Sequence, residues 1–334
     1  INKYIFKYEI IKIDKIDSFE LKSLNLRSYY HNNILAFGDL LHKIHPLAGQ
    51  GFNMTIRDIK VLMNIIKEKF RNENGIMSIG VSDIVGSEGL FDLVYSGLLE
   101  HEVLFFEGQD INPGVFEKFA TLFGSLLGHG AYDLVDGTQA IQILESTKAK
   151  PSKIEVWHSD MTFTQIPPTF TMLHAQVLPP YGGDTMWASS RAAFEALSPN
   201  MQSLLEGLKA EHDFRQGFKE SLAEPGGEER LKDALAQYPK VVHPVVLEHP
   251  EIQKKSLFVN ALFTSRILEL SDLESSRLLA FLFNHVVTEE YTVRLQWKKS
   301  TLVIWDNRTT QHKPVNDFFP HHRLMHRATV ARKR

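Results

Sequence analysis

The sequence predicts a mainly β fold with α-helical insertions, in which the strands form a double-stranded β-helix, or jelly roll. Short stretches rich in apolar and β-branched residues recur along most of the chain, whereas segments with the apolar spacing of a helix are fewer. Antiparallel architectures of this class are built from many short strands. We find no internal repeat and no low-complexity tract in the sequence.

A change in composition divides the chain near residue 76. Ile, Lys and Asn together make up 30 of residues 1–76, but only 30 of the 258 residues that follow. A shift of this size marks a boundary between segments. We therefore expect a short N-terminal segment over residues 1–76 and a separate domain over residues 77–334, which begins at Met77.

Charge and cysteine content exclude several classes of protein. The 334-residue chain has a formal net charge of −3, so neither nucleic acid nor a charged membrane is expected as a partner. It has no cysteine, which excludes disulfides and zinc–thiolate or iron–sulfur sites and fits a reducing, cytoplasmic location. No apolar run reaches eighteen residues and no signal peptide is recognisable, so no membrane span is predicted.

Between residues 102 and 183 the sequence predicts short strands and one helix. Asn112 is a suitable N-cap and Pro113 a suitable first residue for a helix that continues to about Leu127. Gly128–Tyr132 is expected to form a loop. The predicted strands are dense in apolar residues and are Glu102–Glu107, Ile141–Leu144, the segment Trp157–Asp160 and Thr171–Leu178, which is followed by a turn at residues 179–183.

Residues 189–240 are expected to be mostly helical, with one strand near Ala210–Phe214. The charged stretch Glu228–Lys232 fits a solvated helix face. Ser271 with Glu274 three residues later has the pattern of a capping box and predicts a helix to His285. The remaining predicted strands are Val241–Leu247, Ser256–Asn260, Thr292–Trp297, Thr301–Trp305 and Leu324–Ala331.

His158 and Asp160 are the first candidates for a metal site. On a strand, side chains two residues apart point to the same face, so an imidazole and a carboxylate would lie side by side. His312 would complete a set of two His and one carboxylate, which holds Fe(II) and leaves positions open for a co-substrate and oxygen. Zinc is the competing metal, but zinc sites prefer tetrahedral closure.

A second His-x-acid triplet, His249-Pro250-Glu251, is expected to lie on the surface. It falls in a proline-containing turn just before a pair of lysines. We therefore do not expect this triplet to bind a metal.

Arg323 and Arg327 are four residues apart on the last predicted strand, so they share a face. Two guanidinium groups buried on one inner face would be costly without anions to pair them. The pattern predicts two anion-binding sites.

Several literal motifs occur in this part of the chain: GGDT at 182–185, EHDF at 211–214, VVHPVV at 241–246, WDNR at 305–308, TQH at 310–312 and MHRAT at 325–329. With the His158–Asp160 pair, they resemble the 2-oxoglutarate-dependent taurine dioxygenase family from about Val81 to Val330. The resemblance implies a jelly-roll enzyme that uses Fe(II), 2-oxoglutarate and O₂.

The resemblance also implies a role for each candidate residue. Iron would be held by His158, Asp160 and His312. Arg323, aided by the Thr185 hydroxyl, would bind the distal carboxylate of 2-oxoglutarate. The anionic head of a small substrate would be bound by Arg327, His129 and Tyr132, between walls formed by Phe163 and Phe218.

One departure from the family concerns the substrate. The taurine enzymes carry a polar, Asn-rich segment near the substrate amine, whereas this chain has Ile154-Glu155-Val156. The first expectation is hydroxylation of a small organosulfonate, taurine being the first choice, at the carbon next to sulfur, which releases sulfite, an aldehyde, succinate and CO₂. Alkyl sulfate esters and aryloxyacetates are alternative substrates, a non-catalytic binding protein is a further alternative, and a homo-oligomer is left open.

Residues Phe37–Asn53 resemble the second flavin-binding motif of FAD-dependent hydroxylases of the ubiquinone-biosynthesis type. Asp39 would follow the short strand Ile34–Phe37, and Gly49 and Gly51 would allow close backbone approach to the cofactor before a helix over 52–69. The segment lacks the G-x-G-x-x-G motif of such enzymes. We expect a C-terminal fragment that does not function alone and does not bind FAD, with an FAD-dependent monooxygenase as the alternative.

Overall fold

The computed structural model describes residues 79–128, 132–152 and 154–332, together with four two-residue strands nearer the N-terminus. The chain divides into two compact units, Ile1–Asn74 and Gly75–Arg334. In the first unit β1 (Leu24–Asn25) pairs with β4 (His42–Lys43), and β2 (Tyr30–His31) pairs with β3 (Ile34–Leu35). Strand β3 covers the first two residues of the expected strand at Ile34–Phe37, whereas the rest of that strand, Asp39, Gly49, Gly51 and the expected helix over 52–69 lie outside the described residues.

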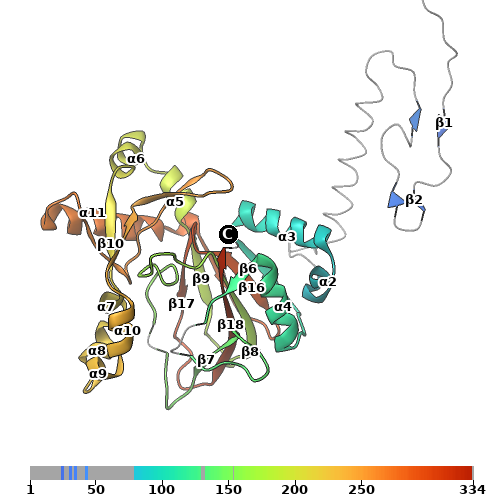
Figure 1. The fold of residues 1–334 in the computed structure, drawn as a ribbon, viewed down its shortest axis with the longest axis horizontal. Coiled ribbons are helices and arrows are strands. Elements are labelled where there is room, and N and C mark those ends of the chain that lie inside the picture. Colours follow the sequence, from blue (N-terminus) through green and yellow to red (C-terminus); the bar gives the residue numbers. More distant parts are fainter. Residues whose placement is uncertain are drawn as a thin grey trace, which may run out of the picture. The chain divides into compact units, whose positions relative to one another are not determined.

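The second unit is built on two antiparallel sheets (Figure 1). The larger sheet has the order β5-β16-β8-β18-β6, with β7 paired to β18. Its strands are β5 (Val103–Phe106), β6 (Gly124–Leu126), β7 (Gln142–Ser146), β8 (Phe170–Val177), β16 (Leu302–Asp306) and β18 (Arg323–Arg332). The smaller sheet has the order β15-β9-β17, with β9 (Thr185–Ser189), β15 (Thr292–Leu295) and β17 (Thr310–Pro314).

An aromatic core joins the two sheets. Trp187 of β9 lies against Trp305 of β16, with ring centroids 5.7 Å apart. The buried residues around this pair are Leu173, Ala175, Val303 and Met325 of the larger sheet and Trp297, which follows β15 of the smaller sheet. Two antiparallel sheets packed face to face in this way form the predicted jelly-roll core.

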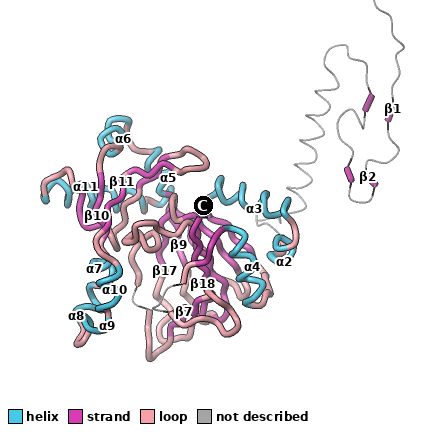
Figure 2. Tube along the Cα trace, in the orientation of Figure 1, coloured by secondary structure: helices cyan, strands magenta, loops and turns pink. Residues whose placement is uncertain are grey.

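Three helices lie near the larger sheet in Figure 2: α2 (Val81–Val85), α3 (Glu88–His101) and α4 (Pro113–Phe123). Helix α3 contacts β5 and β16, α4 contacts β18, and α2 packs against the other two helices. The expected N-cap of α4 is confirmed, because the Asn112 side chain accepts a hydrogen bond from the Val115 amide. The helix ends earlier than expected, since Gly124 begins β6 beside Ala331, and a Cβ there would collide with the Ala331 carbonyl oxygen. Helix α3 was not predicted.

The long insertion between β9 and β15 forms a second lobe, and its first part, residues 189–240, is mostly helical, as expected. A small sheet within it has the order β11-β10-β14, and β12 pairs with β13. The lobe contains α5 (Ser190–Glu195), α6 (Pro199–Leu205), β10 (Lys209–His212), α7 (Phe214–Gly217), α8 (Lys219–Ala223), α9 (Gly227–Arg230), α10 (Lys232–Gln237), β11 (Val241–Pro244), β12 (Val246–Glu248), β13 (Lys255–Leu257), β14 (Thr264–Ile267), α11 (Asp272–Val286) and the 3-10 turn η4 (Glu289–Tyr291).

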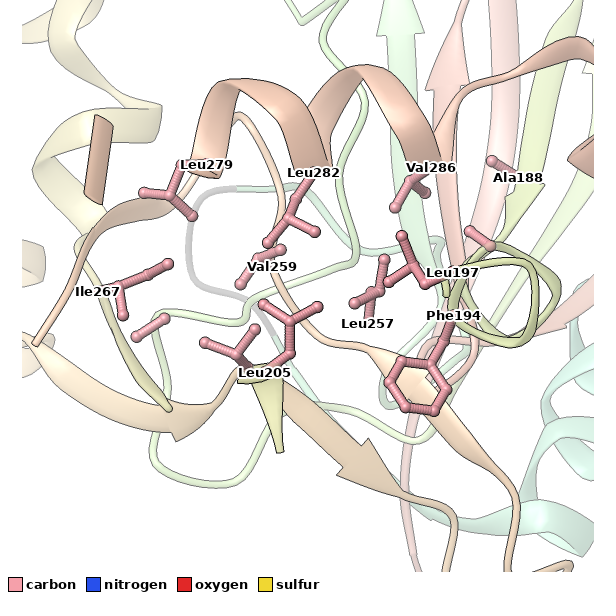
Figure 3. Packing of buried hydrophobic residues seen from close by; sticks show 13 residues of the cluster. Ala188, Phe194, Leu197, Leu205, Leu257, Val259, Ile267, Leu279, Leu282 and Val286 are labelled. Atoms are coloured by element: carbon pink, nitrogen blue, oxygen red, sulfur yellow. The ribbon is translucent and has the colours of Figure 1, made fainter. Parts of the chain in front are cut away.

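Helix α11 anchors this lobe. Its predicted capping box is confirmed, because Ser271 and Glu274 exchange side-chain and backbone hydrogen bonds. Figure 3 shows Leu279, Leu282 and Val286 of the helix directed into a cluster of apolar side chains from the strands and helices beneath it.

Two local expectations are wrong. Trp157–Asp160 is not a strand: only His158 forms a bridge, to His312, and a turn follows. His249 is not on the surface, since it is 1% exposed and its Nε2 lies 3.1 Å from Asp306 Oδ2. Its neighbour Glu251 accepts hydrogen bonds from Tyr95 and Arg308, so the triplet belongs to a buried ion-pair network that no local pattern reveals.

Among the described residues, no helix has both the length and the apolarity that a membrane crossing requires.

Replacing Leu282 by Ala tests the role assigned to α11. Leu282 is fully buried, so Leu282→Ala should lower the free energy of unfolding by about 2–5 kcal/mol through lost burial and a new cavity. Leu273 on the same helix is 68% exposed, and Leu273→Ala should change it by less than about 0.5 kcal/mol. Urea denaturation of both variants measures the difference, and equal effects would contradict this packing.

Candidate metal centre and anion pocket

Backbone pairing brings together two histidines that are far apart in the sequence. The His158 amide donates to the His312 carbonyl at 3.0 Å, and the His312 amide donates to the His158 carbonyl at 2.7 Å. His312 lies on β17, which is held in register by β9. The two imidazole rings are 4.2 Å apart between centroids, so two potential nitrogen ligands lie close together at the edge of the smaller sheet.

Asp160 adds an oxygen to this pair. Its Oδ1 lies 3.7 Å from His158 Nε2 and 3.9 Å from His312 Nε2. One ligand atom from each residue lies within 4.8 Å of the others, and all three residues are buried. The convergence expected from the sequence is present, although a turn rather than a strand produces it.

Hydrogen bonds orient the first imidazole and the carboxylate. His158 Nδ1 donates to the Val156 carbonyl at 2.7 Å, which leaves the Nε2 lone pair free for a metal. The Thr171 hydroxyl donates to Asp160 Oδ2 at 2.6 Å, so Oδ1 remains directed at the histidines.

The threonine is itself held in place. Its Oγ1 accepts from Asn307 Nδ2 at 2.9 Å, and Asn307 Oδ1 accepts from Trp305 Nε1 at 3.0 Å. This chain fixes the amide orientation of Asn307 and commits the Thr171 proton to the carboxylate. Asp160 is therefore oriented from the central strands of the larger sheet.

The charge of the set suits a divalent cation. Burial lowers the pKa of His158, and burial lowers the pKa of His312 to about 3, so both imidazoles are neutral near pH 7. Burial opposes the charge on Asp160, but the positive charge of Arg327 and the hydrogen bond from Thr171 favour it, and its pKa lies below the usual value. Two neutral imidazoles and one carboxylate form the facial donor set of non-haem Fe(II) sites and leave coordination positions open.

A pocket opens beside these three residues. Its empty volume is about 460 Å³, part of which is open to solvent. Besides His158 and Asp160, it is lined by Tyr132, Ile154, Met161, Phe163, Phe218, Leu262, Phe263, Arg327 and Thr329. Phe163 and Phe218 thus lie in the wall, where the sequence placed them. The lining is apolar except at a few points, which is typical of a site for a small organic ligand.

Arg327 is the cation of this pocket. Its Nε donates to Gln142 Oε1 at 2.8 Å, and its guanidinium carbon lies 4.4 Å from the centre of the Tyr132 ring. These contacts fix the plane of the guanidinium without neutralising its charge. Tyr132 and Arg327 therefore lie together as expected, whereas His129 lies outside the described residues.

Most of the Arg323 guanidinium is buried. Its Nε and Nη2 are buried without a hydrogen-bond partner in the described part of the chain, and its guanidinium lies 5.9 Å from the ring centres of Trp297 and Phe318. Burial lowers the pKa of Arg323 to about 10, which still leaves it protonated near pH 7. An unpaired buried guanidinium is costly, so the residues present fit a ligand carboxylate.

The surroundings of Arg323 support this interpretation. Thr185 Oγ1 accepts from Trp297 Nε1 at 2.9 Å, which places the threonine beside the ring that Arg323 contacts. A Cβ on Gly183, whose φ is +72°, would lie 3.3 Å from Arg323 Cδ and Nε. The glycine turn that the sequence singled out therefore leaves room for the guanidinium.

Sequence reasoning missed several residues of the site. Asn307 could have been suspected, because it lies in the same motif as His312. Nothing in the sequence marked Thr171, Gln142 or the apolar residues Met161 and Leu262, since their roles depend on strand register and loop packing.

Comparisons with known proteins found several matches. The family model "Taurine catabolism dioxygenase TauD, TfdA family" matches residues 69–329, and an FAD binding domain model matches residues 7–75. An alkylsulfatase of Acinetobacter baylyi is 39% identical over 242 residues, which cover 71% of this chain and 75% of the relative. An alpha-ketoglutarate-dependent sulfate ester dioxygenase of Pseudomonas putida is 33% identical, with coverages of 72% and 80%.

A further relative and a solved structure also match this chain. An alpha-ketoglutarate-dependent 2,4-dichlorophenoxyacetate dioxygenase of Cupriavidus pinatubonensis is 37% identical, over 76% of this chain and 90% of the relative. A crystal structure of a Burkholderia xenovorans protein that is named as an alpha-ketoglutarate-dependent taurine dioxygenase by assignment matches with a TM-score of 0.65 at 28% identity. That likeness covers 77% of this chain and 87% of the other.

Removing the Thr171 hydroxyl tests the orientation of Asp160. Thr171→Val should weaken binding of Fe(II), or of Mn(II) as its surrogate, by about 10- to 100-fold, because the carboxylate loses the partner that directs Oδ1. Anaerobic titration calorimetry measures this affinity. Thr169→Val, a change of the same kind at a neighbouring buried threonine, is the control and should bind normally; equal affinities in both variants would contradict the assignment.

Proposed function

The chain belongs to the taurine catabolism dioxygenase (TauD/TfdA) family, and we propose that residues 77–334 form an Fe(II)- and 2-oxoglutarate-dependent dioxygenase acting on a small organic anion with a sulfur-containing head. The observation that carries the proposal is the convergence of His158, Asp160 and His312 beside a pocket whose lining includes Arg327. The resemblances noted in the sequence, to this family and to an FAD-binding domain before it, are confirmed.

The proposed roles follow from the contacts described. His158, Asp160 and His312 would hold Fe(II), and Arg323 with Thr185 would bind the distal carboxylate of 2-oxoglutarate. When bound, iron and 2-oxoglutarate supply the oxidative decarboxylation that activates O₂ and yields succinate and CO₂. The protein contributes positioning and a water-poor cavity. We place this chemistry in the cytoplasm, because reducing conditions favour the Fe(II) state.

Arg327 would bind the anionic head of the substrate. Its charge faces a pocket whose other described lining residues are mostly apolar. Ile154 lies in that lining, and the adjacent Glu155 is exposed and accepts a hydrogen bond from the Asn316 amide. Apart from Asp160, no carboxylate is among the described lining residues, so a substrate ammonium would lack a partner.

These features favour a sulfate ester or sulfonate with an apolar tail. Taurine, the first choice from the sequence, stays a candidate that this pocket supports less well. Oxidation at the carbon that carries the sulfate oxygen gives a hydroxylated ester that collapses to an aldehyde and sulfate. A sulfonate hydroxylated next to sulfur gives an aldehyde and sulfite, so the released anion reports the substrate class.

An aryloxyacetate is the second candidate substrate, supported by the relative named for 2,4-dichlorophenoxyacetate. Arg327 can pair with a carboxylate as readily as with a sulfate. Oxidation at the carbon between the ether oxygen and the carboxylate would release a phenol and glyoxylate.

A substrate screen tests the proposal. With Fe(II), O₂ and 2-oxoglutarate, we expect hexyl sulfate to raise 2-oxoglutarate consumption and to release sulfate. Its kcat/KM should be about tenfold or more above that for taurine, since the described lining residues offer the taurine ammonium no carboxylate besides Asp160. Succinate, sulfate, sulfite and phenol are measured separately. A protein that consumes no 2-oxoglutarate with any sulfate, sulfonate or aryloxyacetate would refute it.

Arg327→Met should lower kcat/KM for the best substrate on the order of 100-fold, because the anionic head loses its charged partner in a desolvated pocket. Steady-state kinetics give the value. Arg266→Met removes a partly exposed arginine that is not among the residues lining the pocket and should leave the kinetics unchanged; a similar loss in both variants would argue against the anion site.

We also propose that residues 1–76, which include the match to an FAD binding domain model, take no part in catalysis by the domain that follows. A protein that begins at Met77 should keep its kcat/KM within about twofold, because every proposed ligand lies in the remaining domain. The full chain, incubated with FAD and desalted, should show no flavin absorbance near 450 nm. Bound flavin together with loss of activity on truncation would favour the alternative, an FAD-dependent monooxygenase.

A further inference from the structure

A cluster of polar side chains lies buried behind the pocket wall, outside the residues assigned so far. Asn260 Nδ2 donates to Thr162 Oγ1 at 3.0 Å, and His212 Nδ1 lies 3.0 Å from the same oxygen. His243 Nε2 lies 2.9 Å from the Thr162 carbonyl oxygen and 3.0 Å from that of Thr164. We call His212, His243 and Asn260 the polar clasp; all three are buried.

The hydrogen-bond directions within the clasp can be assigned. Asn260 Oδ1 accepts from the Phe263 amide at 2.9 Å, which makes Nδ2 the donor to Thr162. The Thr162 hydroxyl can then donate its own proton to His212 Nδ1. Carbonyl oxygens only accept, so His243 Nε2 carries a proton. Burial lowers the pKa of His243 and lowers the pKa of His212 to about 3, so the clasp is neutral.

Packing alone does not explain the clasp. His212 Nε2 is buried without a hydrogen-bond partner among the described residues, and a buried donor without a partner is unfavourable. An apolar side chain would fill the same space without that cost. The imidazole is better explained by the Thr162 hydroxyl that it fixes.

The segment that the clasp holds is strained. Met161 has a φ of +49°, a left-handed conformation that is unfavourable for a residue with a Cβ. The Thr164 amide donates to the Met161 carbonyl and closes a tight turn. Strained backbone persists where surrounding contacts over-determine it, and the clasp supplies such contacts from β10, β11 and the loop after β13.

This turn carries part of the pocket wall. Phe163 lines the pocket and meets Phe263 at 4.9 Å and Phe214 at 5.1 Å between ring centres. Asn260 therefore fixes both sides of the Phe163–Phe263 contact, through Thr162 and through the Phe263 amide. Asp160 is oriented separately by Thr171.

We propose that His212, His243 and Asn260 are positioning residues that fix the Thr162–Thr164 turn, so that Phe163 holds the bound substrate with one carbon facing the oxidant. This inference rests on the proposed function. It predicts that loosening the clasp separates two events that are normally coupled: consumption of 2-oxoglutarate continues, but oxidation of the substrate fails in many turnovers. Metal binding is unaffected.

The test compares variants of the full chain. In His243→Leu, aldehyde formed per 2-oxoglutarate consumed should fall about threefold or more, because displacement of a bound substrate by about an ångström is enough to disrupt reaction. Affinities for Mn(II) and 2-oxoglutarate, measured anaerobically, should change by less than about twofold. His243→Gln, whose amide can donate from near the Nε2 position, should restore most of the coupling.

His285→Leu is the matched control. His285 Nε2 lies 2.7 Å from the Ala193 carbonyl oxygen, so the variant also removes an imidazole donor from a carbonyl, but in the α11 region rather than behind the pocket. It should keep the wild-type coupling. Thr162→Val is a second route to the same loss and serves if His243→Leu fails to fold.

Two outcomes would overturn the proposal. One is a lowered melting temperature with unchanged coupling in both His243→Leu and Thr162→Val. The other is a rate of hydrogen exchange for the backbone amides of residues 161–164 that is the same in these variants as in the wild type. The clasp should slow this exchange, and the measurement needs no substrate. A wild-type protein that consumes no 2-oxoglutarate would refute the proposed function instead, and the exchange measurement would still decide on the clasp.

Discussion

The mutual backbone hydrogen bonds of His158 and His312 are the constraint on which the site depends. They join a loop to the smaller sheet and set the separation of the two imidazoles. The position of His312 in turn depends on the turn between β16 and β17, where Asp306 accepts from Arg308 Nε at 2.8 Å and from the Arg308 amide at 2.9 Å. His249 completes this buried group. Burial opposes the charge of Asp306, but its hydrogen bonds with Arg308 and His249 hold its pKa below the usual value.

Buried ion pairs of this kind contribute little net stability compared with apolar packing, but removing one partner is strongly destabilising. Their value here is geometric. Glu251 binds the same arginine and also accepts from the Tyr95 hydroxyl of α3, so the network connects a helix, a loop of the second lobe and the turn before β17. Each connection limits the movement of the strand that carries His312, and a metal ligand must be held within a few tenths of an ångström to be effective.

The sequence alone predicted the jelly-roll class, most strands, the caps of α4 and α11, and the three residues that converge at the candidate metal centre. These features depend on local spacing and on literal motifs. What it missed depends on contacts between distant segments. The role of Thr171 depends on the register between β8 and β16, which no local pattern around Thr171 reveals. His249 resembles a surface residue in the sequence because its partner Asp306 is 57 positions away. The expected strand at Trp157–Asp160 is limited to one bridge at His158, and a turn with Met161 in a left-handed conformation begins at Asp160.

The supports of the metal centre and those of the pocket come from different parts of the fold. Thr171 and Asn307, which orient Asp160, belong to the central strands of the larger sheet and the turn that follows them. Phe163, Phe218 and Phe263 are held by the second lobe, where helices and loops vary with less effect on the sheets. Changes in the lobe can therefore reshape the pocket while the candidate metal ligands keep their geometry. This separation is a physical reason why relatives named for alkyl sulfates, sulfate esters and phenoxyacetates can share one family.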